Sequence, residues 1–153
     1  MADVKFEPVL AQMPTSAGGT LDVAAPVGFG QPKAIMVLGQ NNNGTLDSVG
    51  TNYNSSIGYA DGTNQSVVVM QAVSTLTASE PTRYHSTDSL LVRLQPGTTT
   101  GLDRLNFNQW LPEGVRLDVG AASAAANYFT VVFIGGAGAV SYTHLTLPTI
   151  LLV

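Results

Sequence analysis

The sequence lacks cysteine altogether and has few charged residues. Without cysteine, the chain has no disulfide framework, no thiolate metal ligand and no cysteine nucleophile. Only 10% of the 153 residues are charged, with 10 acidic residues against 6 basic ones. Nucleic-acid-binding proteins usually gather positive charge on one face, whereas the four arginines here are scattered through the second half of the chain. We therefore expect no nucleic-acid partner.

A hydrophobic leader and a membrane span are not expected either. Met1–Lys5 leads into a mixed polar segment without an apolar run of the signal-peptide type, which favours synthesis in a cytoplasm without export by that route. Residues 128–153 carry no charge apart from His144, but a spanning helix needs about 20 continuous apolar residues. Gly135-Gly136 interrupts this run, so we expect no membrane partner.

The final residues resemble translated sequencing-adapter DNA. Residues 140–149 read VSYTHLTLPT, which matches an in-frame translation of a common library adapter. Foreign segments of this kind are excluded before the fold is considered. We therefore expect one native domain in residues 1–139, truncated at its carboxyl end, and a non-native tail in residues 140–153. A genuine terminal strand is the alternative.

The residues that are abundant, Gly, Ser, Thr and Asn, separate short apolar runs at intervals of roughly 8 to 15 residues, which is typical of a sandwich or barrel. The pattern predicts an all-β fold, an antiparallel, jelly-roll-like β-sandwich of about eight strands. The expected strands are Thr20–Ala24, Lys33–Leu38, Ile57–Asp61, Ser66–Val73, Ser89–Leu94, Leu102–Phe107, Val115–Val119 and Tyr128–Ile134.

Residue alternation indicates which strands are central. Val115–Val119 alternates strictly between apolar and charged residues, so we expect one buried face and one solvated face. Ala34–Leu38 and Phe129–Ile134 are almost continuously apolar, which predicts strands that are covered on both faces. A neighbouring domain or subunit is a candidate for the second cover.

Three connections complete the expected organisation. Gly39–Ser56 is the longest irregular segment, and long loops tend to be functional or mobile, although Asn and Gly also serve ordinary turns. Asp61-Gly62 predicts a tight turn between two strands. Ala121–Ala126 is expected to be a small-residue loop rather than a helical turn, because strand signals flank it closely.

Candidates for catalysis are few. His85 lies beside Ser86 and three residues before Asp88, so a serine nucleophile with a histidine base is conceivable if the fold supplies the geometry. No serine lies in a G-x-S-x-G elbow. The ten acidic residues show no obvious pair of the kind that glycosidases use. We expect no catalytic residue and no enzyme.

Metal and phosphate sites are also not expected. Asp61–Asn64 and Asp47-Ser48 offer oxygen atoms that calcium accepts, but neither segment fits a D-x-[DN]-x-[DN]-G loop. Gly28–Gly30 precedes a strand, which is the wrong order for a phosphate-binding turn. The glycines more plausibly serve a bend, and we assign no cofactor or metal.

A carbohydrate-binding or receptor-binding module is the alternative function. N-x-[ST] matches at Asn43, Asn54 and Asn64 accept glycans only in secreted eukaryotic proteins, and chance explains them in this composition. Aromatic side chains near the Gln40–Asn54 loop could instead stack on sugars, although packing explains most single aromatics. The candidate stacking residues are Tyr53, Tyr59, Tyr84 and Trp110.

Five blocks follow the order of segments in a known family. Gly28–Val37 resembles the G-F-x-P-K-A-V opening strand of uncharacterised virion proteins of tailed bacteriophages. Ile57–Ala60 resembles their G-x-G-F-A element, and Arg83–Asp88 resembles their R-x-H-T-D segment. Leu105–Leu117 resembles their F-x-x-D-G-F-T-L hairpin, and Phe129–Gly136 resembles their closing Y-L-A-L-G-G strand.

This resemblance implies a β-sandwich module in tail or capsid-surface proteins and supplies no catalytic residues. It implies a virion location after assembly in a bacterial host. Expected partners are other virion proteins and further copies of the chain, with a host-surface glycan as an additional candidate.

Overall fold

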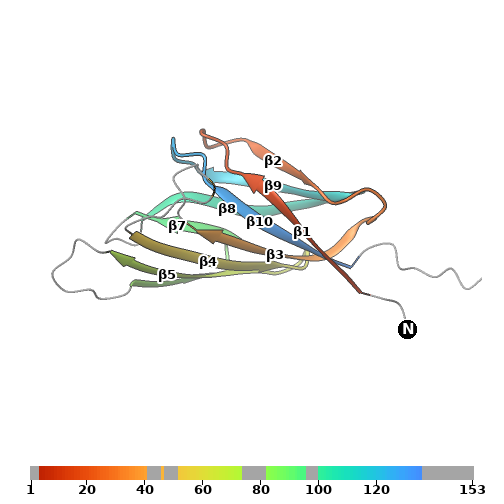
Figure 1. Ribbon diagram of the computed structural model, residues 1–153, viewed down its shortest axis with the longest axis horizontal. Coiled ribbons are helices and arrows are strands. Elements are labelled where there is room, and N and C mark those ends of the chain that lie inside the picture. The colour runs from red at the N-terminus through yellow and green to blue at the C-terminus, as the bar shows by residue number, and fades with distance from the viewer. Residues whose placement is uncertain (1–3, 41–45, 47–51, 74–81, 96–99, 136–153) are drawn as a thin grey trace, which may run out of the picture.

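The computed structural model describes residues 4–40, 46, 52–73, 82–95 and 100–135. These residues form two antiparallel sheets that pack as a β-sandwich, and the described residues include no helix (Figure 1). The six-stranded sheet has the order β1 (Lys5–Gln12), β10 (Tyr128–Gly135), β3 (Pro32–Gln40), β4 (Asn52–Ala60), β5 (Gln65–Val73) and β6 (Thr82–Ser86). The four-stranded sheet has the order β2 (Thr20–Ala24), β9 (Gly114–Ala121), β8 (Gly101–Leu111) and β7 (Leu91–Leu94).

The all-β sandwich prediction is confirmed, with ten strands in the described residues instead of about eight. The two strands that the sequence did not indicate, β1 and β6, are the two edges of the six-stranded sheet. Edge strands tolerate proline and polar residues because one side of the strand makes no ladder hydrogen bonds. Pro8 interrupts the apolar pattern of β1, and β6 is short and largely polar.

The two ends of the described chain meet in one sheet. β10 lies between β1 and β3 and pairs with both in antiparallel register. The return of β10 to the side of β3, the first strand of the β3–β4–β5 meander, is a Greek-key arrangement. Jelly rolls are built from the same element. Figure 1 shows the two sheets as stacked layers.

An apolar layer between the sheets forms the core. Ile35 and Val131 from the six-stranded sheet and Leu105 and Leu117 from the four-stranded sheet are completely buried in it. Burying a side chain of this size stabilises the fold by about 1.5–3 kcal/mol relative to leaving it exposed. The alternation predicted for Val115–Val119 is confirmed, because its three apolar residues are buried in this layer.

The described residues bury one face of β3 and β10 and leave the opposite face partly exposed. Ile35 and Val37 of β3 are fully buried, but Met36 and Leu38 on the opposite face are 38% and 39% exposed. The outward side chains of β10 are half-buried by their neighbours within the sheet. Within the described residues, the second sheet covers the inner face of these strands. A cover from a neighbouring domain or subunit stays a prediction.

The structure also corrects the connections. Gln40 and residues 52–56 belong to β3 and β4, so the predicted Gly39–Ser56 irregular segment is shorter, and most of it lies outside the described residues. The alanine-rich segment is a non-helical connection, as predicted. The turn at Asp61-Gly62 is confirmed between β4 and β5. Residues 136–153, including the adapter-like tail, lie outside the described residues.

Gly58 of β4 lies directly against the backbone of Leu90, the residue before β7. A Cβ atom built on Gly58 would lie 1.7 Å from the carbonyl oxygen of Leu90. A backbone carbonyl cannot turn away as a flexible side chain can, so this position in β4 requires glycine. The space between the sheets is therefore set by backbone as well as by side-chain packing.

We expect Gly58→Ala to lower the free energy of unfolding by about 3 kcal/mol, because the added methyl group forces two strands apart. Gly19→Ala is the matched control, since a Cβ atom there would have no atom within 4 Å. Urea unfolding followed by the fluorescence of the single tryptophan measures both variants. Equal stability of the two variants would contradict the assigned contact.

Candidate interaction surface

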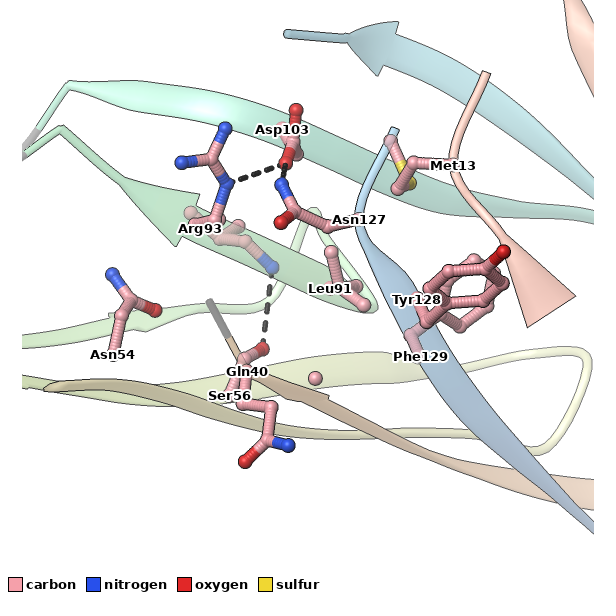
Figure 2. Close-up of a pocket in the computed structure, with 12 residues that line it drawn as sticks. Met13, Gln40, Asn54, Ser56, Leu91, Arg93, Asp103, Asn127, Tyr128 and Phe129 are labelled. Atoms are coloured by element: carbon pink, nitrogen blue, oxygen red, sulfur yellow. Dashed lines mark hydrogen bonds and ion pairs between the residues drawn. The ribbon is translucent and has the colours of Figure 1, made fainter. Parts of the chain in front are cut away.

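A polar cluster is buried between the sheets and is the first place to look for chemistry (Figure 2). Arg93 of β7 donates from Nε to Asp103 Oδ2 of β8 at 2.5 Å, and from Nη2 to Ser123 Oγ at 2.5 Å. The Asp103 carboxylate also accepts hydrogen bonds from the backbone N–H of Ser123 at 2.7 Å and from Asn127 Nδ2 at 2.9 Å. The carboxylate is thus held by three different residues.

These contacts keep Asp103 ionised. Burial by itself would raise the pKa of Asp103. The hydrogen bond and charge of Arg93, together with the hydrogen bonds from Asn127 and Ser123, lower the pKa by more than burial raises it, so the pKa lies below its ordinary value. The adjacent cavity has a volume of about 10 Å³, which is about the space of one water molecule. The Asp103 carboxylate is thus fixed by its partners beside a cavity of this size.

The fold separates the residues of the serine–histidine arrangement that the sequence left open as an alternative. His85 and Ser86 are neighbours in β6, and successive side chains of a strand point to opposite faces. The Ser86 hydroxyl accepts a hydrogen bond from the backbone N–H of Asp88 at 3.1 Å, as in an ordinary turn. His85 is exposed on the outer side of the sheet, so the geometry does not bring a base to this serine.

The candidate oxygen ligands at Asp61–Asn64 and the glycines at Gly28–Gly30 form a turn and a bend, as the sequence predicted. Asp61 Oδ1 accepts hydrogen bonds from the backbone N–H groups of Thr63 at 2.9 Å and Asn64 at 2.7 Å, and these bonds lower the pKa of the carboxyl group. Gly28 and Gly30 have φ values of +78° and +77° and flank the buried Phe29, so they form a bend. Within the described residues, no group of three or more His, Asp or Glu could hold a metal.

The candidate stacking aromatics do not converge. Tyr53 and Tyr59 lie on the outer side of β4 but are six positions apart. Trp110 belongs to the other sheet, where its ring packs against Phe107 with 4.8 Å between the centroids. Tyr84 packs against a separate small core cluster.

The asparagines of the N-x-[ST] matches lie in different surroundings. The Asn54 side chain is buried and donates a hydrogen bond to the Leu94 carbonyl, whereas Asn64 is an exposed turn residue. Asn43, and Asp47 of the candidate calcium segment, lie outside the described residues.

The feature that the sequence reading missed is the outer side of the six-stranded sheet. Strand register aligns its outward side chains in rows, such as Leu10, Thr130, Leu38, Ile57 and Val68 from β1 to β5. Most of the exposed large hydrophobic residues of the described chain lie here, and their exposed fractions run from 38% to 63%. We call this surface the outer apolar face, and its main residues are Phe6, Leu10, Met36, Leu38, Tyr53, Ile57, Tyr59, Val68 and Met70.

Charged side chains lie at the borders of the outer apolar face. The outward positions that strand register aligns on β1, β10, β3, β4 and β5 carry no Asp, Glu, Lys or Arg. Asp61 lies beside Tyr59 at the β4–β5 turn, and Lys33 is exposed at the bulge where β3 begins. Arg83 and the exposed His85 enter at the edge strand β6, opposite Met70 and Val68. A sheet side that faces water usually alternates polar residues with the buried ones, so this composition indicates a surface made for contact.

The opposite side of the sandwich has the composition of a solvated surface. On the outer side of the four-stranded sheet, Asp22 and Arg116 form an exposed ion pair at 2.6 Å. Asp118 accepts a hydrogen bond from Asn108 Nδ2 at 2.7 Å. The two outer sides therefore differ although both belong to antiparallel sheets of one chain. Among the residues that the structure describes, exposed apolar rows lie on the six-stranded sheet.

Two open depressions indent the six-stranded side. One has a volume of about 370 Å³ and lies within the outer apolar face, where Leu10, Leu38 and Ile57 line it together with Leu46 of the β3–β4 connection and several polar residues. The other has a volume of about 530 Å³ and is mainly polar, with Tyr59 beside Asp61, Asn64 and other small residues at the β4–β5 turn. Neither is an enclosed site.

The described residues contain no helix that is long and apolar enough to cross a membrane.

We expect Asp103→Asn to lower the free energy of unfolding by about 3 kcal/mol or more at pH 7, because Arg93 loses its buried counter-charge. Since folding lowers this pKa, the stabilisation is fully present above the ordinary value of about 3.9 and is lost as the pH falls through the folded value. Urea titrations at neutral and acidic pH measure both effects.

Asp22→Asn is the matched control, because it removes a carboxylate from an ion pair that water already solvates. Its effect on stability at pH 7 should be much smaller. Equal losses in the two variants would show that the buried cluster has no special structural role.

Comparisons with known proteins give one distant similarity. No protein-family model and no curated protein match the chain. The tailspike protein of Acinetobacter phage vB_ApiP_P1 is a structural neighbour, with 15% sequence identity and a TM-score of 0.37. The match covers 86% of this chain and 21% of the tailspike chain. The chain therefore bears a low structural resemblance to one region of a phage tailspike protein.

Proposed function

We propose that this chain is a structural module of a phage virion, in the tail or on the capsid surface, that acts by assembly and adhesion rather than by catalysis. The observation that carries the proposal is the outer apolar face. A surface of this composition is stable in water only when another surface covers it or when it is small. A component of a particle built from many subunits has that cover in its working state.

Two further observations support the proposal. The buried polar cluster around Asp103 is saturated by its own neighbours, so it serves the fold rather than a substrate. The order of sequence blocks from Gly28 to Gly136 resembles that of virion proteins of tailed phages. A module of this kind would work in the particle after assembly in the host cytoplasm, with other virion proteins as partners.

The proposal predicts that the chain is a constituent of particles. An antibody raised against the purified chain should detect it in virions of the encoding phage after banding on a density gradient. The control is a host cytoplasmic protein of similar size, which should stay in the soluble fractions. Detection of the chain in the lysate but not in banded particles would contradict the proposal.

A carbohydrate-binding module is the second candidate, and the polar depression at the β4–β5 turn favours it. Tyr59 is 41% exposed there and lies beside hydroxyl, amide and carboxylate groups. Aromatic faces flanked by polar groups suit sugar rings, which present both C–H surfaces and hydroxyls. Trp110 is not part of this depression.

This candidate predicts glycan binding that depends on Tyr59. Binding to a broad glycan array should be lost in Tyr59→Ala, which removes the stacking surface, and retained in Tyr53→Ala, which removes an exposed tyrosine elsewhere on β4. Absence of binding by the unmodified chain, or equal binding by both variants, would remove the candidate.

A further inference from the structure

We propose that the outer apolar face is the docking site for a second copy of this chain, and that the two six-stranded sheets pack face to face. This inference rests on the proposed function, because it names the partner that would cover the outer apolar face during assembly. Sheets pack in this way about 10 Å apart in natural sandwiches, with apolar side chains interdigitating between them. The chain already uses this mode once, between its own two sheets.

The exposed area matches what a stable dimer needs. The nine residues of the outer apolar face have exposed fractions of 38% to 63%. If a large residue has a full area of roughly 200 Å², these fractions correspond to about 900 Å² on each copy. A standard protein–protein interface buries about 800 Å² per partner, whereas the largest apolar patch of a typical monomer covers about 300–600 Å².

The charge distribution favours a second copy over a charged partner. The aligned rows from β1 to β5 carry no charged side chain. The carboxylate of Asp61, which lies beside Tyr59 at the end of β4, already accepts hydrogen bonds from the backbone of its own turn. A partner of matching chemistry must therefore be flat, apolar and uncharged. The outer apolar face of another copy has this composition, and a twofold interface uses the same patch on both subunits.

The place of Arg83 sets the orientation of the pair. Arg83 and His85 lie on β6, at the border of the sheet. A twofold axis parallel to the strands and between β3 and β4 places β6 of one copy over β1 of the other. The two Arg83 side chains then lie at opposite borders of the interface, where water reaches them. Ile57 and Leu38, neighbours across β3 and β4, lie near the axis.

Sedimentation velocity of the full chain tests this inference. The unmodified chain should sediment as a dimer at micromolar concentration. Ile57→Lys places a charge at the centre of the interface and should weaken association by about tenfold or more. Thr20→Lys adds the same side chain to an exposed position of β2, on the other sheet, and should leave the dimer unchanged.

The absence of cysteine provides an independent readout. Ile57→Cys should form a cross-link between two copies with a short bifunctional maleimide, and Thr20→Cys should not. Circular dichroism checks that each variant is folded. A cross-linked Ile57→Cys dimer that is absent from virions would uphold the inference and reject the proposed function.

Several outcomes would overturn the inference. They are a monomeric unmodified chain at 100 µM, a trimer, an Ile57→Lys variant that dimerises as tightly as the unmodified chain, and equal cross-linking at positions 20 and 57. Co-sedimentation with neutral lipid vesicles in place of dimerisation would also overturn it, because the occupant would then be a lipid surface.

Discussion

Contact between the inner faces of the two sheets is the constraint on which the rest of the structure depends. This contact buries one side of every central strand. It also fixes the distance between the sheets, because Gly58 packs directly against the Leu90 carbonyl. Phe29 and Phe133 pack with ring centroids 6.0 Å apart in the same layer. Because the described residues form two sheets, this contact covers one side of β3, β4 and β10 and leaves apolar side chains such as Met36 and Ile57 on the other side exposed.

The polar groups between the sheets follow from the same constraint. Arg93 and Asp103 lie where two strands of the smaller sheet meet the connection before β10, and the low polarity there makes unpaired charge costly. Asn127 completes the set by donating to Asp103 and by accepting, at its backbone carbonyl, a hydrogen bond from Met13. The cluster thus connects the segment before β10 to the smaller sheet and to the segment after β1.

Function then depends on the surface that the core does not use. The four-stranded sheet presents charged pairs such as Asp22 with Arg116 to water, while the six-stranded sheet presents rows of apolar residues. A difference of this kind within one sandwich is the physical basis for the proposed role in assembly. Coverage by a second copy would give β3 and β10 the two buried faces that their nearly continuous apolar sequences predict.

The sequence by itself determined the all-β class, most central strands, the turn at Asp61-Gly62 and the alternation of Val115–Val119, because strand periodicity and turn chemistry are local properties. It missed the edge strands β1 and β6, whose proline and polar residues carry no strand pattern. Only the tertiary structure decided that Asn54 is buried, that His85 and Ser86 face apart, and that Ile57 belongs to an exposed apolar face. Those facts depend on which strands become neighbours and on which side the second sheet packs, and such long-range pairings are not encoded in any single segment.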